Sequence, residues 1–154
     1  MGKINFGRVL LGGIITGLVI DVLSWLVDGV ILNSQWTAGN AKLGIGPFSG
    51  GQTVWFCVLG LIAGLIIIWF YAACRPRLGS HHRTALNVSL MAWILGYVLP
   101  NAGFMYVSGL YSHNLMVYTS LGSLVEVVLG TYIGAAVYKE SNVSSAVAPK
   151  AAAV

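Results

Sequence analysis

Charged residues are scarce in this chain: Asp, Glu, Lys and Arg make up only 8% of its 154 residues. A soluble globular domain carries roughly 25%. Hydrophobic residues account for 57%, and the mean hydropathy is +0.84. The shortage of charge excludes a soluble domain as the main body of the chain, and the composition predicts an integral membrane protein.

Cysteine and histidine are also rare, with two and three copies. Cys57 and Cys74 lie near opposite ends of one apolar run, about 25 Å apart at helical rise, so they cannot form a disulfide with each other. Cys74, His81 and His82 are a poor ligand set because neighbouring arginines repel a cation, and we predict no metal site. No histidine lies in the middle of an apolar run, which argues against a haem held by buried imidazoles. We predict no cofactor.

Catalytic motifs are missing as well. The chain has no serine-nucleophile motif, no glycine-rich phosphate loop and no HExxH. Its Lys and Arg residues do not form a basic patch with interleaved aromatics, so we predict no nucleic-acid partner. These absences predict a protein that is not an enzyme.

Four long apolar runs are what the chain does contain, and each is long enough to cross a bilayer as a helix. We predict an all-α polytopic membrane protein in which residues 1–140 form one up-down bundle of four transmembrane helices. The predicted spans are 8–32, 53–74, 84–108 and 114–138. Pro100 removes a backbone donor in the third span, so we expect a kink there. Residues 141–154 are small and unpatterned and predict a low-complexity cytoplasmic tail.

The positions of the cationic residues predict the orientation of the bundle. With four crossings, only Lys42 of the eight Lys and Arg residues lies on the outer side, which places both termini in the cytoplasm. Lys3 and Arg8 precede the first run as in a signal peptide, but the run is too long and lacks a small-x-small cleavage site. We therefore expect an uncleaved span. The longest loop contains Trp36 and Phe48, and we expect it to fold back over the outer face of the bundle.

Acids inside the spans are the strongest functional signal. Of the four acids in the chain, Asp21, Asp28 and Glu126 lie within spans. Ser24 shares one side of the first span with both aspartates. An acid in hydrocarbon is costly, so these side chains should face protein. The first and last spans run antiparallel, and we expect Asp21 and Glu126 at similar depth, where they could share a proton or a cation.

Three roles stay open for these acids. They could be polar glue hydrogen-bonded to Ser24, Asn87 or Tyr97, they could dock against a span of another subunit, or they could form a proton or cation path. Ser24 and Asn87 are candidates for the same path. Asp28 lies near the outer end of its span, where it is either solvated or paired with His113.

Glycines recur at spacings of four or eight residues in three spans. They are Gly13 and Gly17 in the first span, Gly60 and Gly64 in the second, and Gly122, Gly130 and Gly134 in the fourth. Such faces let two helix backbones approach closely. We expect more of these faces than one small bundle can use, which predicts packing against other membrane-protein subunits or a second copy.

Four stretches of the sequence carry a family likeness: GRVLLGGIITGLVIDV, YAACRPRLG, ILGYVLPN and VVLGTYIGAAVYKE. They resemble a family of small, uncharacterised, four-span bacterial membrane proteins. The resemblance covers most of residues 6–140. It implies a four-helix bundle in the bacterial inner membrane and supplies no activity, cofactor or site residue.

From these features we predict a non-enzymatic accessory or assembly subunit of a larger bacterial membrane complex, respiratory or photosynthetic. The alternative is a small proton-coupled transporter or channel that uses Asp21 and Glu126. A third class is a lipid-binding structural protein, because the cytoplasmic turn with Arg75, Arg77 and Arg83 suits anionic head groups.

Overall fold

The structure is a computed structural model that describes residues 4–140. These residues are almost entirely helical and contain no strand. Within them, four helical spans are long and apolar enough to cross a membrane: Phe6–Ile31, Gly50–Leu78, His81–Val107 and His113–Val137. The predicted all-α bundle of four membrane helices is confirmed, and no span end differs from its predicted position by more than four residues. The predicted tail at 141–154 lies outside the described residues.

Side-chain caps mark where the long helices begin. The side chain of Asn5 accepts a hydrogen bond from the backbone of Arg8 at the start of α1 (Phe6–Ser24). Ser49 and Gln52 form a capping box at α3 (Gly50–Leu78). Ser80 caps α4 (His81–Trp93), and Ser112 caps α6 (His113–Val137). These caps satisfy backbone donors that have no partner within the helix.

Two of the spans depart from regular α-helix. The first continues beyond α1 as a π-helical segment, η1 (Trp25–Ile31). The third runs through η2 (Ile94–Val98), α5 (Leu99–Ala102) and η3 (Gly103–Val107). Pro100 lies in α5, so the irregularity expected there takes the form of π-helical turns on both sides of the proline. Such wide turns accommodate a residue without a backbone donor.

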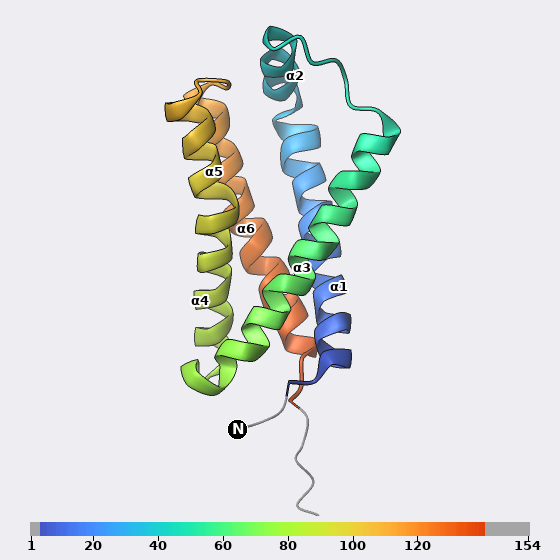
Figure 1. The fold of residues 1–154 in the computed structure, drawn as a ribbon, viewed down its shortest axis with the longest axis vertical. Coiled ribbons are helices and arrows are strands. Elements are labelled where there is room, and N and C mark those ends of the chain that lie inside the picture. Colours follow the sequence, from blue (N-terminus) through green and yellow to red (C-terminus); the bar gives the residue numbers. More distant parts are fainter. Residues whose placement is uncertain (1–3, 141–154) are drawn as a thin grey trace, which may run out of the picture.

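Helix α1 is the central element of the bundle, with α3 on one side and α6 on another. Helix α4 packs on α6 and on α3. Figure 1 shows α3 crossing the bundle obliquely: its Leu78 end lies near α4, and its Gly50 end is far from α4 and α5. Both ends of the described chain lie at the lower end of this view, which we call the termini end. The opposite end, where α2 (Asn33–Lys42) lies, is the α2 end.

Helix α2 forms the first half of the longest loop and packs beside the start of α6 at the α2 end. The Trp36 ring packs edge-on against Tyr111 with centroids 5.1 Å apart, and the Tyr111 hydroxyl donates to Asn40 Oδ1 at 3.0 Å. Residues 41–49 are exposed. Phe48 packs edge-on against Phe56, which lies on the exposed first part of α3 and not in the interior of the bundle. Only the first half of the loop therefore packs against the end of α6.

Glycines hold α1 against α3. A Cβ atom on Gly17 would lie 2.6 Å from the α-carbon of Leu61, and one on Gly13 would lie 2.7 Å from the α-carbon of Leu65. From the other side, a Cβ on Gly64 would overlap the backbone of Gly13 and Gly17. Only glycine permits backbones this close.

Glycines also bring α6 against α1. A Cβ on Gly130 would lie 3.1 Å from the carbonyl oxygen of Thr16, and one on Gly134 would overlap the carbonyl oxygen of Gly12. A Cβ on Gly122 would lie 2.5 Å from Val27 Cγ1. The expectation that the glycine faces exceed the needs of one bundle is therefore wrong, because α1 uses them on both of its sides.

Candidate functional site

Glu126 of α6 is the most deeply buried acid among the described residues, at 1% exposure. The Ser24 hydroxyl at the end of α1 donates to Glu126 Oε2 at 2.5 Å. Glu126 Oε1 is buried and has no hydrogen-bond partner within residues 4–140. Gly122 and Gly130 lie one turn to either side of Glu126 and let α1 approach this face of α6. The carboxyl group therefore lies at a close helix contact with one oxygen bound and one free.

Asp28 of η1 lies one helical turn from Ser24, about 6 Å toward the α2 end. Its Oδ1 accepts hydrogen bonds from Trp36 Nε1 at 3.0 Å and from Thr119 Oγ1 at 3.1 Å. The predicted pair of Asp28 with His113 does not form in the described part of the chain. His113 is the first residue of α6 and stacks on Tyr106 with ring centroids 5.4 Å apart, whereas Thr119 lies deeper and reaches Asp28.

Asp21 does not join Glu126. Its carboxylate lies against α3 at Gly60, where any side chain on the glycine would overlap it. No hydrogen bond between described residues reaches Asp21, while Glu126 is bound by Ser24. The expected meeting of Asp21 and Glu126 is not formed, because Asp21 leans toward α3 and Ser24 faces α6.

The third span adds polar groups to this region. The Tyr97 ring in η2 packs against the buried cluster that contains Ile20 and Val127, next to Glu126 in the sequence. Farther along, Trp93 Nε1 donates to the carbonyl oxygen of Ser120 at 2.7 Å, and Asn101 Nδ2 donates to Ser120 Oγ at 2.9 Å. Residue spacing within one helix does not predict these two hydrogen bonds to Ser120, because each joins residues of two different helices.

An apolar layer separates Glu126 from the termini end. It is formed by Ile20, Ile68, Val88 and Val127, all at most 3% exposed. Thr16 lies in the same region and donates to the Gly130 carbonyl oxygen at 3.0 Å. Thr131, on the same side of Glu126, is also fully buried, and its hydroxyl has no hydrogen-bond partner among the described residues.

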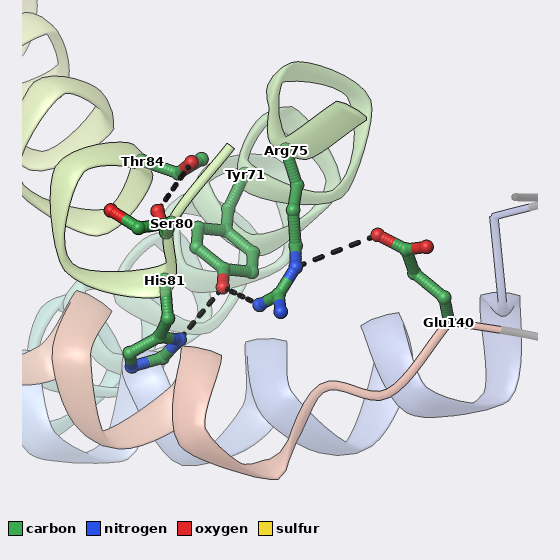
Figure 2. Close-up of polar contacts among 6 residues, drawn as sticks. All are labelled: Tyr71, Arg75, Ser80, His81, Thr84 and Glu140. Carbon is green, nitrogen blue, oxygen red and sulfur yellow. Dashed lines mark hydrogen bonds and ion pairs between the residues drawn. The ribbon is translucent and has the colours of Figure 1, made fainter. Parts of the chain in front are cut away.

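Arg75 lies at the termini end with its guanidinium between Tyr71 and Glu140, as Figure 2 shows. Its Nη1 donates to the Tyr71 hydroxyl, which also lies 2.8 Å from His81 Nδ1. Its Nε lies 3.5 Å from Glu140 Oε1. Of the three arginines predicted to meet lipid head groups, Arg75 is thus engaged by protein, while Arg77 is exposed.

Asn87 lies at this end as well, away from the acids. Its Nδ2 donates to the carbonyl oxygen of Arg83 at 2.8 Å, and the side chain is exposed. It lies in the middle of α4, ten residues or nearly three turns from Tyr97, and it makes no hydrogen bond to Glu126 among the described residues, so the expected contact with the acid is not formed. Within residues 4–140, no group of three or more His, Cys, Asp or Glu side chains could hold a metal ion.

No family model, curated protein or solved structure matches the chain. The resemblance to small four-span bacterial membrane proteins stays a prediction.

Proposed function

We propose that this multi-pass membrane protein moves a proton or a small cation through the carboxyl groups of its bundle, with Glu126 as the binding group. The observation that carries the proposal is the buried Glu126 carboxyl, which has Ser24 on one oxygen and no partner on the other. An ionised carboxylate in such a place costs several kcal/mol unless a proton or cation accompanies it. A group of this kind suits uptake and release of a small cation.

Asp28 supplies the entry step. It lies between the α2 end and Glu126, and Trp36 and Thr119 fix its carboxylate. The apolar layer below Glu126 closes the route to the termini end. Release there requires a rearrangement of α1 against α6, so the mechanism is alternating access and not an open pore.

We further propose that the termini end faces the cytoplasm of a bacterium, across its inner membrane. Five cationic residues lie at or near this end, Arg8, Arg75, Arg77, Arg83 and Lys139, whereas Lys42 belongs to α2 at the other. The positive-inside rule gives this orientation. The resemblance to small four-span bacterial membrane proteins supports the choice of a bacterial inner membrane. The proposed transport includes no catalytic step.

The test is a flux assay with purified protein in vesicles that contain a pH-sensitive dye or, in a parallel set, a sodium-sensitive dye. A potassium gradient with valinomycin sets the membrane potential, and a sodium gradient tests the other cation. The parent protein should move a proton or sodium above the rate of empty vesicles. Glu126→Gln should reduce the rate to that of empty vesicles, and Asp28→Asn should slow it.

Glu140→Gln is the matched control, because Glu140 is an acid outside the bundle interior. It should leave the flux unchanged. Absence of flux in the parent protein for both cations, or equal flux in the parent and Glu126→Gln, contradicts the proposal. Asp21→Asn tests the other acid of the first span. We expect it to reduce the flux less than Asp28→Asn does.

A second candidate is the accessory or assembly subunit. The observation in its favour is the outer part of α3, where residues 50–57 are exposed on every side, including Trp55 at 67% and Phe56 at 58%. A span of another subunit or of a second copy would cover this segment. Extraction from native membranes in mild detergent tests it: migration as a lone monomer on a native gel contradicts the subunit role.

A further inference from the structure

Two hollows lie along the seam between α3 and α4. One of about 440 Å³ is at the termini end, and its lining includes Arg77 and Asn87. The other, of about 390 Å³, extends to Gly96 and Tyr97 in η2. Both are lined by Phe70, Val88 and Met91, so they join into one continuous depression. We call it the α3–α4 groove.

The length of the groove matches one leaflet of a bilayer. It follows the third span from Asn87 to Gly96, nine residues or about 13 Å at helical rise. Half of the hydrocarbon core is roughly 15 Å thick. A groove that starts at a bilayer surface and stops near the middle has the reach of one acyl chain.

The two ends of the groove differ in chemistry. The deep part is apolar, with side chains such as Ile66, Phe70, Met91 and Leu95. The mouth carries Arg77, and no hydrogen bond or ion pair between described residues engages its guanidinium. Arg75 nearby is held by Glu140, the one acid of the described chain at this end. The mouth of the α3–α4 groove therefore places the Arg77 guanidinium at the end of an apolar lining.

We propose that the α3–α4 groove binds an anionic phospholipid from the leaflet at the termini end. One acyl chain lies along Phe70, Val88 and Met91, and the phosphate lies at Arg77. A guanidinium binds phosphate through paired hydrogen bonds, and it gains from the negative surface charge of that leaflet. The deep end of the groove shares Val88 and Val127 with the apolar layer below Glu126, but the test of lipid binding does not depend on ion flux.

A second copy of the chain fits the groove less well. A membrane helix of a neighbour would follow the seam through both leaflets, whereas the groove ends near the bilayer centre. A parallel copy would also bring its own cationic end beside Arg77. The shape and the charge both favour a lipid over a helix.

Native mass spectrometry of the full chain tests the proposal. The protein is inserted in nanodiscs that contain equal amounts of phosphatidylcholine and phosphatidylglycerol, and the lipids that stay bound after ejection are identified. The parent should retain one phosphatidylglycerol. Arg77→Ala should weaken this retention about fivefold, the contribution of one arginine near an anionic surface.

Arg83→Ala is the matched control, because it removes the same charge at the same end from a residue that does not line the groove. It should retain the lipid as the parent does, and Arg77→Lys should retain more than Arg77→Ala. Met91→Trp fills the groove without changing charge and should also lose the lipid. Met91 is 53% exposed, so the larger ring can be accommodated without unfolding.

Three results overturn the proposal. They are equal retention in Arg77→Ala and Arg83→Ala, equal retention of phosphatidylcholine and phosphatidylglycerol by the parent, and a protein dimer that Met91→Trp dissociates. The last result would assign the groove to a second copy.

Discussion

The carboxylate of Asp21 on α1 occupies the space beside Gly60 of α3 that a side chain would need. This contact shields part of an acid from the acyl chains around the bundle. The contact also places the Asp21 carboxylate within the close packing of α1 on α3. The relationship explains why a small residue and an acid face each other across a helix crossing in a membrane.

Gly60→Ala should destabilise the bundle by about 1–3 kcal/mol, because the new methyl group displaces the Asp21 carboxylate or separates the helices. The measurement is unfolding by SDS titration in mixed micelles. Asp21→Ala removes the group that the methyl meets, so the double variant should recover most of the loss. If the two losses simply add, the contact does not couple the residues.

Gly64→Ala should cost more than Gly60→Ala, and Asp21→Ala should not recover it. The methyl group would meet the backbone of Gly13 and Gly17, which no side-chain rotation can clear. Gly103→Ala is the control, because its added methyl meets no atom within 4 Å apart from its chain neighbours and the backbone of its own helix. It should change stability by less than about 1 kcal/mol, and in the favourable direction. Equal effects of Gly64→Ala and Gly103→Ala would contradict the close packing of α1 on α3.

Thr16→Val keeps the shape of a buried side chain and removes its hydrogen bond to the Gly130 carbonyl oxygen. The expected loss is about 0.6–1 kcal/mol, the value typical of hydrogen bonds between membrane helices. Thr37→Val, at an exposed position of α2, is the control and should be neutral. A neutral Thr16→Val would mean that the bond between α1 and α6 adds nothing to stability.

Trp36→Phe should loosen α2. The substitution keeps an aromatic ring against Tyr111 and removes the donor to Asp28 Oδ1. Hydrogen exchange of residues 33–42 should accelerate about tenfold or more, since a hydrogen bond to a charged group contributes about 1.5–3 kcal/mol. Trp55→Phe, on the exposed part of α3, should leave this exchange unchanged. Equal exchange in both variants would show that α2 is held by ring packing alone.

Tyr71→Phe should destabilise the termini end more than Glu140→Gln. The Tyr71 side chain is fully buried, and its hydroxyl meets both Arg75 and His81, so its loss should cost about 1–3 kcal/mol. The Arg75–Glu140 pair is partly exposed and should contribute less than about 1 kcal/mol. SDS titration of the two variants compares them, and the reverse order would contradict the central place of Tyr71.

The spans follow from the sequence because a bilayer requires long apolar runs, and serine before the first helical turn marks three of the helix starts. The partners of the acids do not follow. Helical spacing places Asp21, Ser24 and Asp28 on one side of the first span. In the structure this side lies at the seam between two neighbours, so Asp21 meets α3 while Ser24 and Asp28 meet α6.

Spacing within one helix does not say which neighbour it faces. Spacing also does not show that α1 uses its glycines for close contacts on two sides, with α3 and with α6. Residue spacing does not predict the π-helical segments, although Pro100 predicts an irregularity in the third span. The hydrogen bond of Trp36 to Asp28 depends on the path of the chain after the first span, which residue spacing does not predict.

Helix α1 obtains its buried contacts from the far end of the sequence: Ser24 meets Glu126 across 102 positions, and Thr16 meets Gly130 across 114. During biosynthesis the ribosome delivers the first span to the bilayer long before the fourth exists. The nascent protein must therefore keep Ser24 and Thr16 in the membrane without their final partners. Entry of α6 then completes these contacts, and an interrupted chain that lacks α6 would leave Ser24 without Glu126 and Asp28 without Thr119.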